Sequence, residues 1–302
     1  MNQYRKPDFF IVGAPKCGTT SMYHYLRQHD QIFMPDKKEP HYFGKDLIKM
    51  SDEFIDNEDE YLNLFKDAKS DQKLGEASTF YLYSKSASKE IKEYNPDAKI
   101  IIMLRNPIDF LHSLHSQLLF SGNEDEPNFE IAMELEEERM KGNKLPENID
   151  MIDKIYYLEH VRRIPEQVNN YLDTFGNENV AVILLDDLHK NPEACFIKIL
   201  KLLNVNINFT PDFSIQNPNK AVRSFWIRNL IKRYHNDLGK LRGIFYKKPI
   251  GIIRYFINRN TKLLKRMPVS EVLRNKLIEE LNPRIVQLED ILHIELKHWK
   301  LP

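Results

Sequence analysis

Residues 9–21 read FFIVGAPKCGTTS, an apolar run that passes through glycine and proline into three hydroxyl residues. Four consecutive apolar residues are typical of a buried β-strand. Gly13 and Pro15 end this strand, and the hydroxyls of Thr19–Ser21 are suited to cap the amino end of a helix. The stretch therefore predicts a strand, a tight loop and a helix.

The same alternation of apolar runs and helical periodicity recurs along the chain. Strands are expected at 73–77, 100–104 and 180–185, and helices at 86–94, 108–120, 193–203 and 270–299. A strand that is apolar along its length is buried on both faces, as in a parallel sheet covered by helices. We therefore expect a P-loop-like, three-layer α/β/α fold with a central parallel sheet.

Composition places the chain among globular proteins. It has 302 residues, 44 Lys+Arg against 44 Asp+Glu, and 42% hydrophobic residues, which excludes a disordered or fibrous chain. Two cysteines, Cys17 and Cys195, cannot form a disulfide framework and suit a reducing compartment. The polar first eight residues lack a signal-peptide core, and no apolar stretch approaches the length of a membrane span. We expect one cytoplasmic domain over residues 1–302.

The zero net charge conceals an asymmetry. Residues 220–266 hold 14 basic residues and one acidic residue, so the remainder holds 30 basic and 43 acidic residues. From 251 to 266, apolar and cationic residues interleave at helical spacing, and we expect 225–266 to be a basic helical insertion or cap. It would face an acidic or lipid-linked acceptor or the inner membrane surface, unless it is only a solvated helix pair. The acidic stretch Glu124–Glu138 is expected to be a solvated surface.

The loop after the first strand carries the chemistry of an anion site. Helix amino-terminal N–H groups, a lysine and three hydroxyls suit a phosphate. The residues expected to contact it are Lys16, Cys17, Gly18, Thr19, Thr20 and Ser21. Gly13 and Gly18 keep the spacing of the nucleotide loop G-x-x-x-x-G-K-[ST], but Thr19 stands where that loop has its lysine. An ATP γ-phosphate is therefore not the expected ligand, although a P-loop kinase or NTPase stays an alternative.

The loop resembles the phosphosulfate loop of sulfotransferases that use 3′-phosphoadenosine 5′-phosphosulfate. It is similar to that of the Golgi glycan and heparan-sulfate-type sulfotransferases and their bacterial relatives, P-[KR]-x-G-T-[TS], which residues 15–20 match. The resemblance implies transfer of a sulfuryl group to a hydroxyl or amine, with adenosine 3′,5′-bisphosphate as the product. The implied acceptor is a carbohydrate, a glycolipid or a small alcohol.

Further positions match this family in chain order. Arg105 directly follows the third expected strand, and Ser113 lies eight residues later. In the family an arginine and a serine at these places hold the 3′-phosphate, and a guanidinium and a hydroxyl two helical turns apart can converge on one phosphate. Residues 217–224 look like the family's late basic loop over the same phosphate, which implies this role for Lys220 and Arg223. The glycine that many relatives carry there is absent.

The acceptor side rests on residues 38–43, KEPHYF, which resemble the family segment K-E-x-x-[FY]-F. The resemblance implies that Glu39 takes the proton from the acceptor. His41 is the rival, because an imidazole has the better unperturbed pKa for a base. Glu76 is a possible second carboxylate, and Ala77 stands where some heparan-type relatives have a lysine.

Other partners are not expected. No cluster of cysteine, histidine and carboxylate residues has metal-ligand spacing, so we expect no metal, and we expect no nucleic acid. A non-catalytic module that binds acidic glycan or membrane through the basic segment stays an alternative. The acceptor, the position sulfated and the oligomeric state are not given by the sequence.

Overall fold

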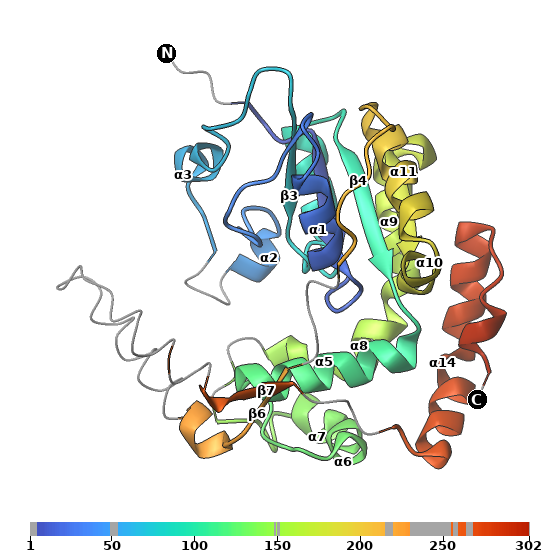
Figure 1. Cartoon of the computed structure of the whole chain (residues 1–302). Helices are drawn as coiled ribbons and strands as arrows, with labels where there is room; N and C mark the ends of the chain where they lie inside the picture. Colours follow the sequence, from blue (N-terminus) through green and yellow to red (C-terminus); the bar gives the residue numbers. More distant parts are fainter. Residues whose placement is uncertain are drawn as a thin grey trace. The chain divides into compact units, whose positions relative to one another are not determined.

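The computed structural model describes residues 5–48, 54–147, 149, 152–214, 220–229, 255, 259–263 and 268–301. The chain divides into two compact units. The first comprises residues 1–110, 160–217 and 280–301, and the second comprises 111–159, 218–279 and 302. Figure 1 shows the elements of both. One domain over 1–302 stays a prediction.

The first unit is built on a five-stranded parallel sheet in the order β2-β3-β1-β4-β5. Its strands are β1 (Phe9–Gly13), β2 (Ile32–Phe33), β3 (Lys73–Ala77), β4 (Lys99–Leu104) and β5 (Val180–Leu184). The central pair, β1 and β4, is buried almost throughout, as strands covered on both faces must be. The predicted parallel sheet is confirmed, whereas β2 was not expected.

Helices flank this sheet. They are α1 (Thr19–Arg27), α2 (Lys45–Ile48), α3 (Glu58–Asn63), α4 (Ala87–Tyr94), α9 (Ile164–Phe175), α10 (Leu185–Lys190) and α11 (Pro192–Leu203), with the 3₁₀ turn η2 (Asn177–Asn179). Helix α9 packs along β4 and α11 along β5, while α1 returns along β1. The arrangement is the expected three-layer α/β/α fold.

The carboxyl-terminal helix is shorter than expected. Helix α14 (Glu271–Leu292) ends where His293 adopts a left-handed φ of 54°, a conformation that cannot continue a right-handed helix. The chain resumes in η3 (Lys297–Trp299). There the buried Trp299 indole donates a hydrogen bond to Asp186 Oδ2 at 2.7 Å, which ties η3 to the residues that follow β5.

The second unit contains mainly short helices. Its elements are α5 (Pro107–Ser121), which begins in the first unit, α6 (Phe129–Glu134), α7 (Glu136–Met140), η1 (Ile152–Ile155), α8 (Tyr157–Arg162), which ends in the first unit, and an antiparallel pair of β6 (Lys220–Val222) and β7 (Thr261–Leu263). The Arg139 guanidinium donates to both oxygens of Glu124 at 2.7 Å, and both side chains are 0% exposed. The expectation that Glu124–Glu138 is a solvated surface is therefore wrong at Glu124 and also at Glu136, which is buried.

Most of the basic segment 225–266 lies outside the described residues. Within the described part, residues 225–229, 255 and 259–260 are helical, but residues 261–263 form the strand β7 and not the expected helix. The backbone of β7 pairs with that of β6 as an antiparallel ladder, in which Val222 lies opposite Thr261. No helix of the described residues combines the length and apolar character that crossing a membrane requires.

Candidate active site

The loop between β1 and α1 presents helix amino-terminal N–H groups. Gly18 caps α1 with a left-handed φ of 87°, and no side chain caps the helix. The prediction that the hydroxyls of Thr19–Ser21 act as the cap is therefore wrong: these residues form the first helical turn. The first intrahelical bond is Met22 N–H to Gly18 O at 3.1 Å, so the preceding amides have no partner within the helix. Such a terminus favours an anion.

Two cationic residues predicted for the site meet at this loop. Arg105 follows β4, the strand that pairs with β1, and its Nη1 donates to the Lys16 carbonyl oxygen at 3.4 Å. The Arg105 side chain is 19% exposed and lies 3.9 Å from Asp109 across one helical turn. The Ala14 amide donates to Met103 O at 2.7 Å, which fixes the loop against the end of β4. The structure thus brings Lys16 and Arg105 together beside the amino end of α1.

The Cys17 side chain is not a reactive thiol. Its side chain is buried, and its Sγ donates to Pro15 O at 3.4 Å. Burial raises the pKa of the Cys17 thiol to about 12, against the opposing charges of Arg105 and Lys16. A neutral buried thiol is neither a nucleophile nor a metal ligand.

A second group of predicted residues lies at the end of β3. The Glu39 amide donates to Ala77 O at 2.9 Å, and the His41 amide donates to Ser78 Oγ at 3.1 Å. Strand β3 is parallel to β1 and adjacent to it. Parallel neighbours present their carboxyl ends at the same edge of a sheet. The segment that carries Glu39 therefore lies at the edge from which the loop of Lys16 departs.

The Glu39 carboxylate is held by two neighbours. Lys38 Nζ lies 2.5 Å from Oε1, and His41 Nε2 lies 3.6 Å from Oε2. Partial burial would raise the pKa of Glu39, but the hydrogen bond from His41 and the charge of Lys38 outweigh it and lower this pKa to about 2. Glu39 is 36% exposed and His41 is buried. At neutral pH Glu39 is therefore an ionised carboxylate that is partly exposed to solvent.

Glu76 lies beneath this segment. Its side chain is 0% exposed, and Oε2 accepts hydrogen bonds from Tyr61 at 2.8 Å and Tyr81 at 3.0 Å. Burial raises the pKa of Glu76 to about 7, against the lowering effect of the neighbouring hydroxyls of Ser78, Tyr61 and Tyr81. The sequence singles out Glu76 only as a possible second carboxylate and gives no sign of either tyrosine. Aromatic residues that contact a carboxylate from distant positions leave no local pattern.

Three predicted cofactor residues belong to the second unit. Ser113 is buried on α5, Lys220 begins β6, and Arg223 is exposed, with its amide donating to Asn260 O at 2.7 Å. Lys16 and Arg105 belong to the first unit, so the convergence of these three residues with them stays a prediction.

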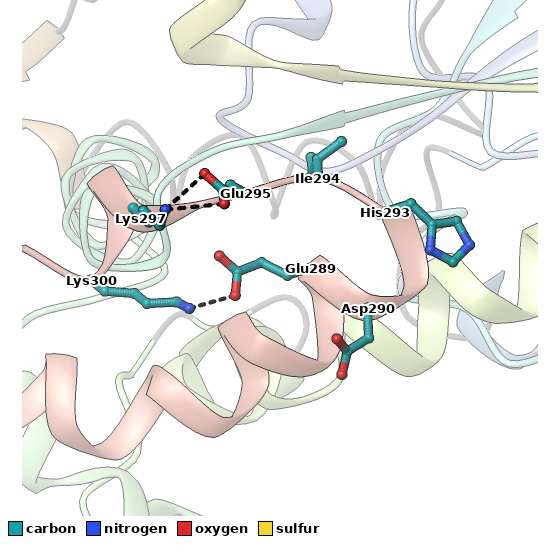
Figure 2. A pocket seen from close by; sticks show the side chains of 7 residues that line it. All are labelled: Glu289, Asp290, His293, Ile294, Glu295, Lys297 and Lys300. Atoms are coloured by element: carbon teal, nitrogen blue, oxygen red, sulfur yellow. Dashed lines mark hydrogen bonds and ion pairs between the residues drawn. The ribbon is translucent and has the colours of Figure 1, made fainter.

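A hollow elsewhere in the first unit lacks every predicted site residue. It is lined by Glu289, Asp290, His293, Ile294, Glu295, Lys297 and Lys300 (Figure 2). Both of its lysines form ion pairs within the hollow, Lys297 with Glu295 and Lys300 with Glu289. Among the described residues, no three histidine, cysteine or carboxylate side chains gather as a metal site requires.

The chain also matches a known protein family. Residues 6–237 match the sulfotransferase domain. The chain belongs to the sulfotransferase domain family. The predicted membership of a sulfotransferase family is thereby confirmed.

Relatives of this sulfotransferase-family chain include carbohydrate sulfotransferase 15 of Mus musculus, 27% identical over 66% of this chain and 44% of the mouse protein. The human bifunctional heparan sulfate N-deacetylase/N-sulfotransferase 2 is 25% identical over 90% of this chain and 31% of that protein. The chain thus spans less than half the length of these relatives. A crystal structure of a sulfotransferase from Alicyclobacillus acidocaldarius is similar over 98% of this chain and 100% of that one, with a TM-score of 0.73 and 29% identity.

Proposed function

We propose that this protein transfers a sulfuryl group from 3′-phosphoadenosine 5′-phosphosulfate to a hydroxyl or amine of a carbohydrate. The observation that carries the proposal is the contact of Arg105 with Lys16 at the amino end of α1. Two cations and the N–H groups of one helix end suit a ligand with several phosphate or sulfate charges. The family match supports sulfuryl transfer as the reaction, and the donor is our inference.

The reaction exchanges one bond to sulfur for another. The acceptor oxygen or nitrogen forms a bond to sulfur, and the bond from sulfur to the bridging oxygen of the 5′-phosphate breaks. That oxygen keeps the electron pair, so negative charge grows on the departing phosphate. Lys16 and the first-turn N–H groups of α1 oppose this charge without reorganising, which is electrostatic stabilisation of the transition state.

The acceptor proton passes to Glu39. Glu39 is ionised at neutral pH and 36% exposed, so it can receive a proton from a group that approaches from solvent. Its low pKa makes it a weak base while Lys38 and His41 hold it, and general-base catalysis improves as the pKa of the base approaches the working pH. We infer that Lys38 leaves Glu39 when the negative donor is bound, because a phosphosulfate competes for the same ammonium group.

A carbohydrate is the proposed acceptor class. The printed names of the mouse and human relatives state a carbohydrate and heparan sulfate. Glycolipids and small alcohols are compared with carbohydrates in the acceptor test. That test supplies radiolabelled donor with heparan sulfate, N-desulfated heparan sulfate, a glycolipid, p-nitrophenyl glucoside or an alcohol without sugar. Label in at least one of the sugar-containing acceptors supports the assignment, and label only in the alcohol contradicts it.

Donor binding is tested separately by thermal denaturation. Adenosine 3′,5′-bisphosphate should raise the melting temperature, and ATP with Mg²⁺ should not. Lys16→Ala should abolish this shift, whereas Lys89→Ala, a change to an exposed lysine on α4, should retain it. Glu39→Ala should retain the shift and lose transfer. Stabilisation by ATP with Mg²⁺ alone would indicate a kinase or NTPase and overturn the proposal.

A further inference from the structure

Glu76 is a buried carboxylate without a cationic partner among the described residues. Its side chain is 0% exposed in β3, and tyrosine hydroxyls supply the hydrogen bonds to Oε2. Tyr61 comes from α3, and Tyr81 follows β3. Burying a carboxylate away from water is costly unless it is paired or hydrogen-bonded. Packing alone therefore does not explain a carboxylate at this position, since an apolar residue would fill the space without this cost.

The hydroxyl groups around Glu76 continue to the segment that carries Glu39. Tyr81 donates to Glu76 and accepts from the Phe43 amide at 3.1 Å. Ser78, two residues after Glu76, accepts from the His41 amide at 3.1 Å. Two backbone amides of residues 39–43 thus bond to hydroxyls beside the buried carboxylate.

Tyr61 holds the same segment by packing. Its ring stacks on Tyr42 with centroids 4.2 Å apart and planes 9° apart, and it meets Phe43 edge to face at 5.7 Å. The hydroxyl of this ring is the one that donates to Glu76 Oε2. The direction of the carboxylate and the position of the aromatic rings are therefore linked.

The held segment needs this support because its backbone is unusual. Glu39 and His41 have left-handed φ angles of 61° and 49°. Such angles are unfavourable for residues other than glycine and persist only where surrounding contacts impose them. Without those contacts the segment would relax, and the Glu39 carboxylate would move away from the place where an acceptor proton is received.

We propose that Glu76 is a positioning residue of the active site, which fixes Glu39 through Tyr61, Tyr81 and the amides of residues 41–43. The inference rests on the proposed function, because it assigns a task to Glu39. Because Glu76 is fully buried, we assign it no direct contact with donor or acceptor.

Glu76 also acts on Glu39 through charge. The negative charge of Glu39 raises the pKa of Glu76, so an ionised Glu76 raises the pKa of Glu39 in return. The titratable groups that face Glu76 are Glu39 from the 38–43 segment, Tyr61 from α3, Tyr81 after β3 and Tyr171 from α9. The pKa of Glu76 is about 7, whereas those of the three tyrosines are raised well above their ordinary value, so Glu76 titrates near neutral pH and they do not. Glu39 is then a stronger base above pH 7 than below it, and kcat should rise with pH through this range.

The test compares wild type with Glu76→Gln, which keeps the shape and an acceptor oxygen but removes the charge. The reaction followed is release of adenosine 3′,5′-bisphosphate from the donor in water, which needs no identified acceptor. Above pH 7 the variant should lose roughly tenfold in kcat, with the donor KM unchanged and the rise near pH 7 absent. A kcat and pH profile like those of wild type would overturn the inference.

A matched variant separates this role from a loss of stability. Glu124 is also a fully buried glutamate that accepts a tyrosine hydrogen bond, from Tyr157 at 2.7 Å, but it lies in the second unit. Glu124→Gln should lower the melting temperature and keep the rise in kcat near pH 7. If both variants only lose thermal stability, Glu76 is structural and the inference fails.

Tyr81→Phe supplies an independent measurement if Glu76→Gln does not fold. It removes the acceptor of the Phe43 amide and keeps the charge of Glu76. The Phe43 amide should then exchange hydrogen faster, and kcat should fall at every pH while the rise remains. Unchanged exchange and kcat would contradict the positioning role. If the wild type neither binds nor consumes the donor, the proposed function itself fails. If the wild type consumes the donor and the Glu76 and Tyr81 variants behave like it, only the positioning role fails.

Discussion

Arg105 donates a hydrogen bond from Nη1 to the backbone carbonyl of Lys16, so the residue after β4 holds the loop after β1. The guanidinium is mostly covered, with 19% of the side chain exposed. Arg105 therefore supports the loop through one N–H group and leaves others in its planar fork for a ligand. The end of β4 therefore positions the lysine that precedes α1, and we propose that both cations bind one ligand.

Replacing Arg105 by lysine should weaken binding of adenosine 3′,5′-bisphosphate. Lysine keeps the charge, but it lacks the planar guanidinium that can donate to the Lys16 carbonyl and to a phosphate at the same time. The affinity should therefore fall roughly 10- to 100-fold. Isothermal titration calorimetry measures the change. Arg27→Lys is the control, because Arg27 lies in the last turn of α1 and pairs with Asp36. Equal affinities for wild type and Arg105→Lys would show that Arg105 serves the loop alone.

Gly18→Ala should damage both stability and nucleotide binding. A Cβ at this position would lie 2.8 Å from Leu185 Cδ1, and φ is 87°. Gly142→Ala is a matched control, because Gly142 has φ 84° and a Cβ there would meet nothing within 4 Å. The control should lose about 1–2 kcal/mol of unfolding free energy from the backbone alone, and Gly18→Ala should lose more. Urea denaturation measures both free energies of unfolding. Equal losses in Gly18→Ala and Gly142→Ala would mean that the Leu185 side chain moves aside without an energetic cost.

The sheet could be predicted because its strands are local features. Each of the strands β1, β4 and β5 is a run of consecutive apolar residues, and a parallel sheet buried on both faces produces that pattern. Strand β2 has only two residues, Ile32 and Phe33, and exists because it pairs with the start of β3. A strand that short has no pattern of its own, and only its partner defines it.

The two segments of the candidate site could be predicted where their residues lie close together in the sequence. The segment 15–20 and the pair Glu39 and His41 carry recognisable spacing, and the structure places both segments at one edge of the sheet. The burial of Glu76 was not predictable, since it depends on Tyr61, fifteen residues away on another element. Likewise the bond from Arg105 to Lys16 spans 89 positions of the chain. Such contacts arise from the fold and leave no local signal.

Lys38→Met should change the acid stability of the protein. The pKa of Glu39 is about 2 in the folded protein against an ordinary 4.5, and Lys38 supplies part of that lowering. The folded state therefore gains stability from Glu39 that is complete above pH 4.5 and is lost as the pH falls toward 2. In Lys38→Met this loss should be smaller and should occur closer to pH 4.5. Urea denaturation between pH 2 and 6 measures it, with the exposed neighbour Lys37→Met as control. Parallel curves for wild type and Lys38→Met would refute the assignment.

Arg139→Met should be among the most destabilising single changes in the second unit. It leaves Glu124 buried without the guanidinium that donates to both of its oxygens. The Tyr157 hydroxyl still donates to Oε2, and the amides of Asp125 and Glu126 still donate to Oε1. Removing one partner of a buried ion pair costs about 3–5 kcal/mol, because the other charge stays without water or a counter-charge. Lys141→Met breaks an exposed pair with Glu138 and should change stability little. The free energies of unfolding in urea give both values. The double variant Arg139→Met with Glu124→Leu should recover part of the loss, because it removes the stranded charge as well. If the double variant is no more stable than Arg139→Met, the loss comes from packing of the arginine stem and not from the unpaired carboxylate.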